Sequence, residues 1–258
     1  GKMVKTMQPA FIIHDISGLH EVPPGHPERP ERHRAIMSAM GDDFLHWTHH
    51  QAPKASRDQL ELVHSASYVE QIFEATGRIA DLVPLDADTW AGPHSLETAQ
   101  RAVGGACLAV DLVMQNKAST AFSAMRPPGH HAEPEQAMGF CLFSSAAIAA
   151  RHAQHVWGID RVAVVDFDVH HGNGTQAAFW DDASLIYASS HQMPLYPGTG
   201  AANEQGAHNN IFNLPCAPGM SGAAIIAGWR DHLLPAIVDA APDLVIISAG
   251  FDAHIDDP

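Results

Sequence analysis

The segment at residues 161–176 reads R-V-A-V-V-D-F-D-V-H-H-G-N-G-T-Q and changes from apolar to polar half-way along. Its β-branched start predicts a buried strand, which the His-Gly-Asn-Gly segment cannot continue. Because side chains alternate between the faces of a strand, we expect Asp166, Asp168 and His170 to share one side. Two carboxylates and an imidazole are costly to bury without partners. The group therefore favours a divalent metal site over a strand end whose polar residues merely bond to nearby loops.

Polar residues also follow other predicted strands. The apolar run at residues 243–250 leads into Asp252, His191 ends another run, and His130 and His131 follow a third. The alternation of apolar strands with helices predicts an α/β fold, in which helices cover both faces of a mostly parallel sheet. Ligands of such folds bind beyond the carboxyl ends of the strands. We therefore expect these polar residues to meet at one edge of the sheet.

Hydrophobic periodicity locates the remaining elements. Apolar runs predict further strands at residues 11–15, 118–125, 185–190 and 211–214. Helical spacing predicts a helix from about residue 30, and others at residues 68–75, 95–114, 145–156 and 221–240. Pro235 implies a kink or break in the last of these, and the Gly104-Gly105 pair is expected to allow close packing. The Pro- and Gly-rich loop at residues 17–30 is either a plain connection or a functional rim.

Length, charge and cysteine content bound the class of protein. The 258 residues are 46% hydrophobic, which suits one large α/β domain. The formal net charge is −15 and no basic patch occurs, so direct nucleic-acid binding is not expected. The 3 cysteines form no C-x-x-C motif, which indicates a reducing compartment and argues against a thiolate metal site. No apolar stretch reaches about 18 residues, so we expect no membrane span and a cytoplasmic location.

Three candidate metal ligands come from two predicted strands. Asp168 and His170 offer an oxygen and a nitrogen from one strand, and Asp252 offers another oxygen from the second. Three protein ligands with an open position are typical of a catalytic site rather than a structural one. A set of this kind without sulfur fits Zn²⁺, and also Fe²⁺ or Co²⁺. Such a metal acidifies a water and polarises a substrate carbonyl.

Two adjacent histidines, His130 and His131, follow a turn that two prolines and a glycine make rigid. In a chain with 19 histidines they could be surface residues, but the rigid turn favours a general base and a general acid. Each would need a partner on its far ring nitrogen, for which Asp166 and Asn173 are candidates. An Asp partner raises basicity whereas an Asn does not, so the two pKa values could be split. The chemistry predicted is metal-assisted hydrolysis of an uncharged carbonyl compound, most simply an amide.

Four segments of the chain together resemble the zinc-dependent histone deacetylase family. They are R-P-P-G-H-H-A, M-G-F-C-L-F, V-V-D-F-D-V-H-H-G-N-G-T-Q and S-A-G-F-D-A-H. The family includes bacterial histone-deacetylase-like amidohydrolases and acetylpolyamine amidohydrolases, and the resemblance runs from about His26 to the last residue. Asn173 stands where class I members have Asp, which is similar to the class II and bacterial branch.

The resemblance implies a fold and a set of catalytic residues. The fold is an arginase-like three-layer α/β/α sandwich around a mostly parallel sheet. The resemblance implies Zn²⁺ on three ligands: Asp168, His170 and Asp252. It also implies two catalytic pairs, in which a second residue supports each histidine: His130 with Asp166, and His131 with Asn173.

The resemblance further implies an acyl channel and a structural K⁺ ion. The channel would be lined by Gly139, Phe140 and Tyr196, and its flat aromatic walls suit an extended methylene chain. The potassium ion would lie close to the zinc strand, held by Asp166, Asp168, His170 and Ser189. Asp86 or Asp88 stands where family members often hold the substrate backbone.

Two departures from the family pattern affect these expectations. Family members carry a Gly-Gly-Tyr segment well after the last metal Asp, and its Tyr stabilises the oxyanion, whereas this sequence stops at Asp256-Asp257-Pro258. We therefore expect residues 1–258 to be a single deacetylase domain that lacks its C-terminal portion. A complete chain would lack an oxyanion donor worth roughly 3 kcal/mol. The segment L-F-S-S at residues 142–145 also differs from the commoner aromatic and Asn residues, which bears on helix packing and not on the metal site.

Three functions are compatible with the sequence. The first is a zinc deacetylase that acts on acetyl-lysine or an acetylpolyamine. The second is a small-molecule amidase that uses the same site, and the third is an acyl-lysine binding module with little catalysis. A rim loop at residues 16–29 that folds over the mouth would favour small substrates, and an open rim would favour proteins. The expected partner is an acetylated amine, and a homo-oligomer stays open.

Overall fold

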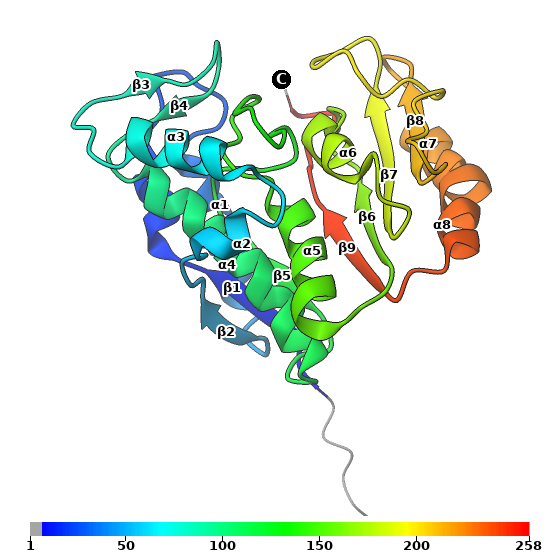
Figure 1. Cartoon of the computed structure of the whole chain (residues 1–258), viewed down its shortest axis with the longest axis horizontal. Helices are drawn as coiled ribbons and strands as arrows, with labels where there is room; N and C mark the ends of the chain where they lie inside the picture. The colour runs from blue at the N-terminus through cyan, green and yellow to red at the C-terminus, as the bar shows by residue number, and fades with distance from the viewer. Residues whose placement is uncertain (1–6, 258) are drawn as a thin grey trace, which may run out of the picture.

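The computed structural model describes residues 7–257 and contains two parallel sheets and an antiparallel hairpin (Figure 1). The first sheet consists, in order, of β2 (Thr48–Gln51), β1 (Ala10–Ile13) and β5 (Ala121–Ser123). The second consists, in order, of β8 (Ile211–Cys216), β7 (Leu185–Gln192), β6 (Val162–Asp166) and β9 (Leu244–Ser248). The hairpin consists of β3 (Val83–Pro84) and β4 (Trp90–Ala91).

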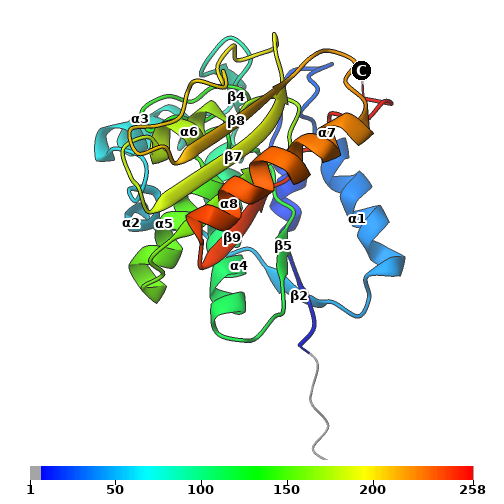
Figure 2. The same cartoon turned by 90° about the vertical axis from the view of Figure 1, so that its right-hand side faces the viewer.

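Helices form an outer layer on each side of the sheets. One layer contains α4 (Ser95–Met114) and α5 (Ser145–Trp157). The other contains α1 (Glu31–Asp43), α7 (Gly222–Gly228), the π-helical turn η2 (Trp229–Leu233) and α8 (Leu234–Ala240). Figure 2 shows α7 and α8 crossing in front of the second sheet. The shorter elements are the 3₁₀ turn η1 (Asp15–Leu19), α2 (Arg57–Leu60), α3 (Ala66–Thr76) and α6 (Asn173–Phe179).

The alternation of apolar side chains along the strands explains why both faces are covered. On β6, Val164 packs into the cluster under α5, whereas its neighbour Ala163 packs with Ile237 of α8. On β1, Ile12 faces the α4 side and Phe11 faces the α1 side. The predicted three-layer α/β/α sandwich with parallel sheets is therefore confirmed.

Most predicted elements are present, with differences at their ends. The helix expected at residues 95–114 is confirmed with those bounds, and α1 begins directly after Pro30. The strand expected at residues 118–125 is shorter, because only Ala121–Ser123 pairs with β1. A Cβ atom at residue 104 would overlap the carbonyl oxygen of Pro53, so Gly104 does allow the close packing expected of it.

One expectation about local structure is wrong, and one about a helix is confirmed. β6 ends at Asp166, so Asp168 and His170 lie in the following loop and do not share a strand face with it. Asp166 Oδ1 accepts the N–H of Asp168 (3.2 Å), a local bond that turns the chain out of the strand. The helix expected at residues 221–240 is present, and η2 interrupts it just before Pro235, in agreement with the kink or break expected at that proline. Proline cannot donate the regular helical hydrogen bond, and the wide turn accommodates it.

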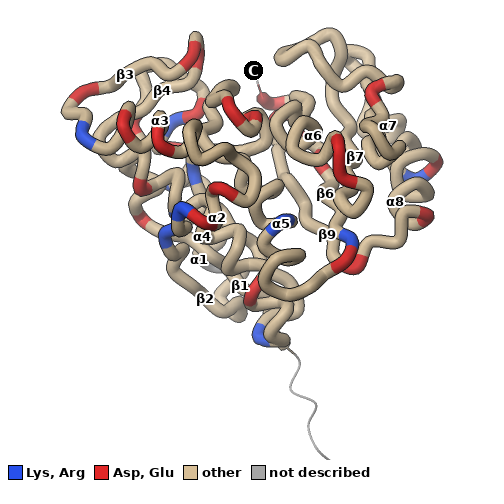
Figure 3. Tube along the Cα trace, viewed as in Figure 1, with Lys and Arg blue, Asp and Glu red and all other residues tan. Residues whose placement is uncertain are grey.

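The surface carries more acidic than basic groups, with 29 Asp and Glu against 14 Lys and Arg. Figure 3 shows the basic residues scattered among acidic ones rather than gathered into a stripe. Among the described helices, none combines the length and apolar character needed to cross a membrane.

Candidate metal centre and histidine pair

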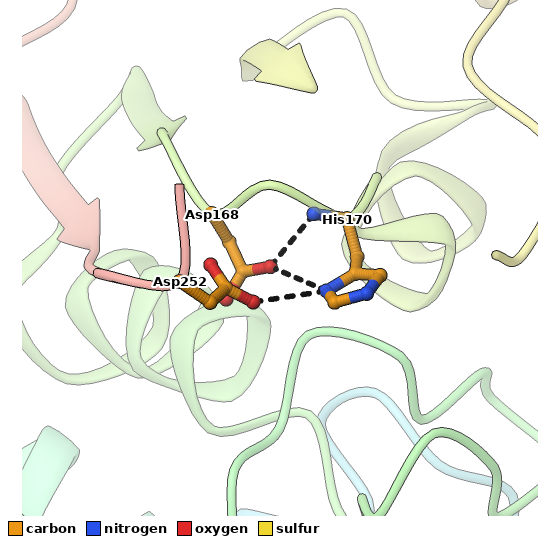
Figure 4. A group of neighbouring side chains, drawn as sticks. All are labelled: Asp168, His170 and Asp252. Atoms are coloured by element: carbon orange, nitrogen blue, oxygen red, sulfur yellow. Dashed lines mark hydrogen bonds and ion pairs between the residues drawn. The ribbon is translucent and has the colours of Figure 1, made fainter. Parts of the chain in front are cut away.

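Asp168, His170 and Asp252 meet beyond the ends of two neighbouring strands. β6 and β9 pair in parallel with Asp166 opposite Ser248, so the loops that follow them start side by side. One ligand atom from each of the three residues lies within 4.8 Å of the other two. His170 Nδ1 is 2.9 Å from Asp252 Oδ2 and 3.2 Å from Asp168 Oδ1 (Figure 4). The predicted convergence of these three residues is therefore present in the structure.

The donor set fits a divalent cation. The hydrogen bonds to Asp168 and Asp252 raise the pKa of His170 to about 10, because two carboxylates surround one ring nitrogen and favour positive charge there. A cation between the three groups would meet the same two carboxylates and a neutral imidazole. Backbone N–H groups of the loop orient the carboxylates: His170 N–H donates to Asp168 Oδ1 (2.8 Å), and Val169 N–H donates to Asp252 Oδ1 (2.9 Å).

The histidine pair lies beside this group. The rings of His130 and His131 are 4.0 Å apart, and both side chains are buried. His130 Nδ1 donates to Asp166 Oδ2 (2.9 Å), and His131 Nδ1 donates to Asn173 Oδ1 (2.9 Å). His130 Nε2 is 3.9 Å from Asp168 Oδ1, so the pair faces the candidate metal ligands. Both partners expected from the sequence are in place.

The two histidines differ in basicity although they are neighbours in the chain. Burial lowers the pKa of His130, but the carboxylates of Asp166 and Asp168 outweigh burial and raise that pKa to about 9. Burial, together with the neighbouring His130, lowers the pKa of His131 to about 2. The two pKa values are therefore split in the direction that an Asp partner and an Asn partner imply.

Asp166 is fully buried and has a second side-chain partner besides His130. Tyr187 O–H on β7 donates to Asp166 Oδ2 (3.0 Å), and its oxygen accepts the N–H of Gly172 (3.1 Å). A Cβ atom at residue 172 would overlap the Tyr187 hydroxyl and approach Asp166. Only glycine therefore fits at the start of α6, which explains the glycine of the His-Gly-Asn segment.

Two of the three residues expected to line an acyl channel, Gly139 and Tyr196, contact His131, and Phe140 lies next to Gly139 in the chain. The Tyr196 ring meets the ring of His131 edge-on, with centroids 5.2 Å apart. Gly139 lies against the His131 ring, where a Cβ atom would overlap it. Phe140 packs edge-on against His26, with ring centroids 4.6 Å apart, and its N–H donates to Thr89 Oγ1.

Two other residues identified from the sequence, Ser189 and His191, lie on β7 and outside the group of three candidate ligands. Ser189 on β7 is buried and pairs in register with Asp166, which places it beside the strand expected to hold potassium. His191 is not part of the ligand group. Both of its ring nitrogens have other partners, the Ser189 hydroxyl (2.9 Å) and the carbonyl of Gly200 (2.8 Å).

The loop at residues 17–30 is fixed by a buried ion pair. Arg126 binds Glu28 through two hydrogen bonds, from Nε to Oε1 (2.6 Å) and from Nη2 to Oε2 (2.7 Å). Both side chains are almost fully buried, and the guanidinium also donates to the carbonyl oxygens of Ser17 and His20. His26 of the same loop shares a hydrogen bond with the carbonyl of Asp88 (2.8 Å). The loop therefore joins the hairpin to the turn that carries the histidine pair, and is more than a plain connection.

Three residues at the site were not identified from the sequence: Glu28, Tyr187 and Glu133. Tyr187 lies two residues before Ser189 on β7 and so shares its face, which is the signal that could have found it. Glu133 lies two residues after His131, and its carboxylate accepts the side-chain N–H of Asn173 (2.8 Å). Glu28 has no local signal, because its partner Arg126 is remote in sequence.

Comparisons with known proteins show which sequences and folds this chain is similar to. The family described as Histone deacetylase domain matches residues 26–258. A probable deacetylase of Methanothermobacter thermautotrophicus is 38% identical over 265 residues, which cover 99% of this chain and 76% of the relative. A histone deacetylase-like amidohydrolase of Pseudomonas aeruginosa is 38% identical over 240 residues, which cover 91% of this chain and 63% of the relative. The solved HDA15 HD domain superposes with a TM-score of 0.91 at 35% identity, covering 98% of this chain and 75% of that one.

Proposed function

The chain belongs to the histone deacetylase domain family, and we propose that it is a zinc-dependent amidohydrolase that removes acetyl groups from acetylated amines. The observation that carries the proposal is the juxtaposition of two groups. The donor atoms of Asp168, His170 and Asp252 converge, and a buried pair of histidines with different partners faces them.

In this proposal, Asp168, His170 and Asp252 hold the metal. Bound there, Zn²⁺ supplies Lewis acidity toward a carbonyl and a nearby water. Fe²⁺ or Co²⁺ suits the same oxygen and nitrogen donors. The backbone N–H groups that bind the two carboxylates keep the donor atoms in place.

The two histidines divide the proton transfers. His131 is neutral and leaves Nε2 free to accept a proton from the water that attacks the acetyl carbon. His130 carries a proton that the Asp166 carboxylate stabilises, and it can protonate the amine nitrogen as the amide C–N bond breaks. The products are acetate and a free amine. Splitting the two roles between groups of different basicity allows both transfers at one pH.

The substrate is an acetylated amine whose chain passes between Phe140 and Tyr196. The loop at residues 17–30 packs His26 on Phe140, which lines the expected channel. A loop that folds over the channel in this way favours a small amine, such as an acetylpolyamine, over a protein lysine. The second candidate substrate class is another small-molecule amide, cleaved at the same site. A potassium ion beside Ser189 and Asp166 would support the loop that carries the metal ligands.

Acetate release tests the proposal. Full-length, zinc-loaded protein would be assayed with an acetyl-lysine peptide, an acetylated polyamine and a simple aliphatic amide. We expect turnover of at least one substrate, with the polyamine preferred over the peptide. Binding of acetyl-lysine without acetate release would indicate a binding module, and no turnover of any amide would contradict the proposal.

A further inference from the structure

We propose that Glu133 is a positioning residue that fixes the side-chain amide of Asn173, and through it the tautomer of His131. The inference deepens the function proposed above and rests on it, because it concerns how His131 becomes able to accept a proton. Nothing in the sequence motifs assigns Glu133 a role, and the case for one comes from its contacts.

The contacts form a line of three side chains. His131 Nδ1 lies 2.9 Å from Asn173 Oδ1, and Asn173 Nδ2 donates to Glu133 Oε1 at 2.8 Å. The same Nδ2 lies 3.4 Å from the carbonyl oxygen of His131 and 3.3 Å from the sulfur of Met138. All three groups around Nδ2 are therefore acceptors.

An asparagine amide can occupy this place in two orientations. With its oxygen toward His131, it accepts from Nδ1–H and leaves Nε2 of the ring with a free lone pair. With its nitrogen toward His131, it would donate to Nδ1 and move the ring proton to Nε2, which then could not accept a proton. An ionised carboxylate offers only acceptors, so Glu133 favours the first orientation and disfavours the second.

The partner of His130 needs no additional carboxylate to orient it. Its partner, Asp166, has acceptors on both carboxylate oxygens, so either orientation of that group leaves the proton on His130 Nδ1. The additional carboxylate, that of Glu133, therefore contacts Asn173, the uncharged partner, because only an amide must be held in one of its two orientations.

The backbone around Glu133 is held firmly enough for this role. Glu133 and Gln136 exchange two backbone hydrogen bonds across a tight turn (3.0 and 3.3 Å). The carbonyl of the intervening Pro134 accepts from His64 Nδ1 (3.1 Å) and from the N–H of Ser65 (3.4 Å). Glu133 is partly buried and also lines a surface cavity.

The first test compares Glu133→Gln with Glu135→Gln, an exposed residue of the same turn that lies outside the line. Glutamine can present its own N–H₂ to Asn173, so both amide orientations become accessible. We expect kcat of E133Q to fall roughly 10-fold or more, with KM and bound zinc unchanged. E135Q should match the parent protein within about twofold, as expected of a surface substitution.

A spectroscopic readout makes the test independent of activity. In protein with ¹⁵N-labelled histidine, the ring nitrogens of His131 should show the Nδ1–H tautomer, and E133Q should shift them toward a mixture. An unchanged tautomer in E133Q would overturn the proposal. If the parent protein cleaves no amide, the proposed function fails, yet the tautomer measurement still decides the role of Glu133.

The second test changes Asn173 itself. In Asn173→Asp, both side-chain oxygens are acceptors, so the residue needs no contact with Glu133 to be oriented toward His131. The carboxylates of residues 173 and 133 then lie close together and repel each other. We expect E133Q to raise kcat in the N173D background, although it lowers kcat in the parent. An equal loss in both backgrounds would show a structural role and overturn the proposal. If E133Q alone does not fold, comparing kcat of N173D with kcat of the double variant N173D/E133Q still tests the role of Glu133.

Discussion

β6 and β9 lie side by side in the same sheet and both lead into candidate metal ligands, but they differ in burial. Val162 and Val164 of β6 are fully buried in the cluster under α5, and β6 lies between β7 and β9. On β9, Val245 is 49% exposed and Ile247 is 61% exposed. Within the described residues β9 pairs only with β6, so it forms an edge of the sheet (Figure 1). Within residues 7–257, these two similar apolar runs therefore differ in how far the rest of the chain covers them.

The difference extends to how the ligands are held. Asp168 and His170 belong to one short loop that is tied back to the buried Asp166. Asp252 follows the exposed strand, and its described backbone contact to the other loop is the hydrogen bond from Val169 N–H. We infer that the β6 loop provides the fixed part of the metal centre, to which the β9 loop is joined.

The largest expected effect comes from removing a ligand of the fixed part. Asp168→Ala deletes one carboxylate of the donor set and leaves His170 with a single acidic neighbour. We expect bound zinc to be lost and activity to fall roughly 1000-fold or more, since the metal contributes several kcal/mol of transition-state stabilisation. Zinc content by elemental analysis and acetate release would be measured on the same sample.

The control for this variant is Asp256→Ala, which changes an exposed carboxylate in the last described segment. It should keep full zinc content and activity. Stoichiometric zinc in D168A would show that the ligand assignment is wrong, whatever the activity.

A smaller effect is expected from matched substitutions in the two strands. Val164→Ala creates a cavity in the cluster under α5 and should lower the free energy of unfolding by roughly 2 kcal/mol. Val245→Ala removes methyl groups that are already half in water, so we expect a loss below about 1 kcal/mol in the 258-residue chain. Chemical denaturation of both variants measures the difference. Equal losses would mean that β9 is as well covered as β6.

The sequence predicted which polar residues meet at the candidate site better than it predicted their surroundings. Asp168, His170 and Asp252 could be identified because metal ligands need particular residue types, and those types stand directly after apolar runs. The partners of His130 and His131 could be proposed for the same reason. Glu133 and Tyr187 could not, because their contribution depends on which groups meet across the fold, and neither residue type is unusual in a turn or a strand.

The fold class was predictable because alternating strands and helices admit few arrangements. The position of β9 at a sheet edge was not, because the run at residues 243–250 is as apolar as a central strand. Local patterning reports that a strand is compatible with burial, whereas its exposure depends on which other strands pair with it. The end of β6 at Asp166 depends on a side-chain to backbone bond, which hydrophobic periodicity does not report.

The smallest expected effect concerns the link between the two loops. In the proposed site, a bound zinc ion would hold Asp252 in place, and Asp252 Oδ1 accepts the N–H of Val169. Removing zinc with a chelator should therefore raise the hydrogen-exchange rate of the Val169 amide severalfold, because Asp252 then becomes free to move away. The amides of Val162 and Val164 should be unaffected, since they lie in the buried strand. An equal rise across β6 would mean that metal removal loosens the whole sheet, and that the two strands respond as one unit.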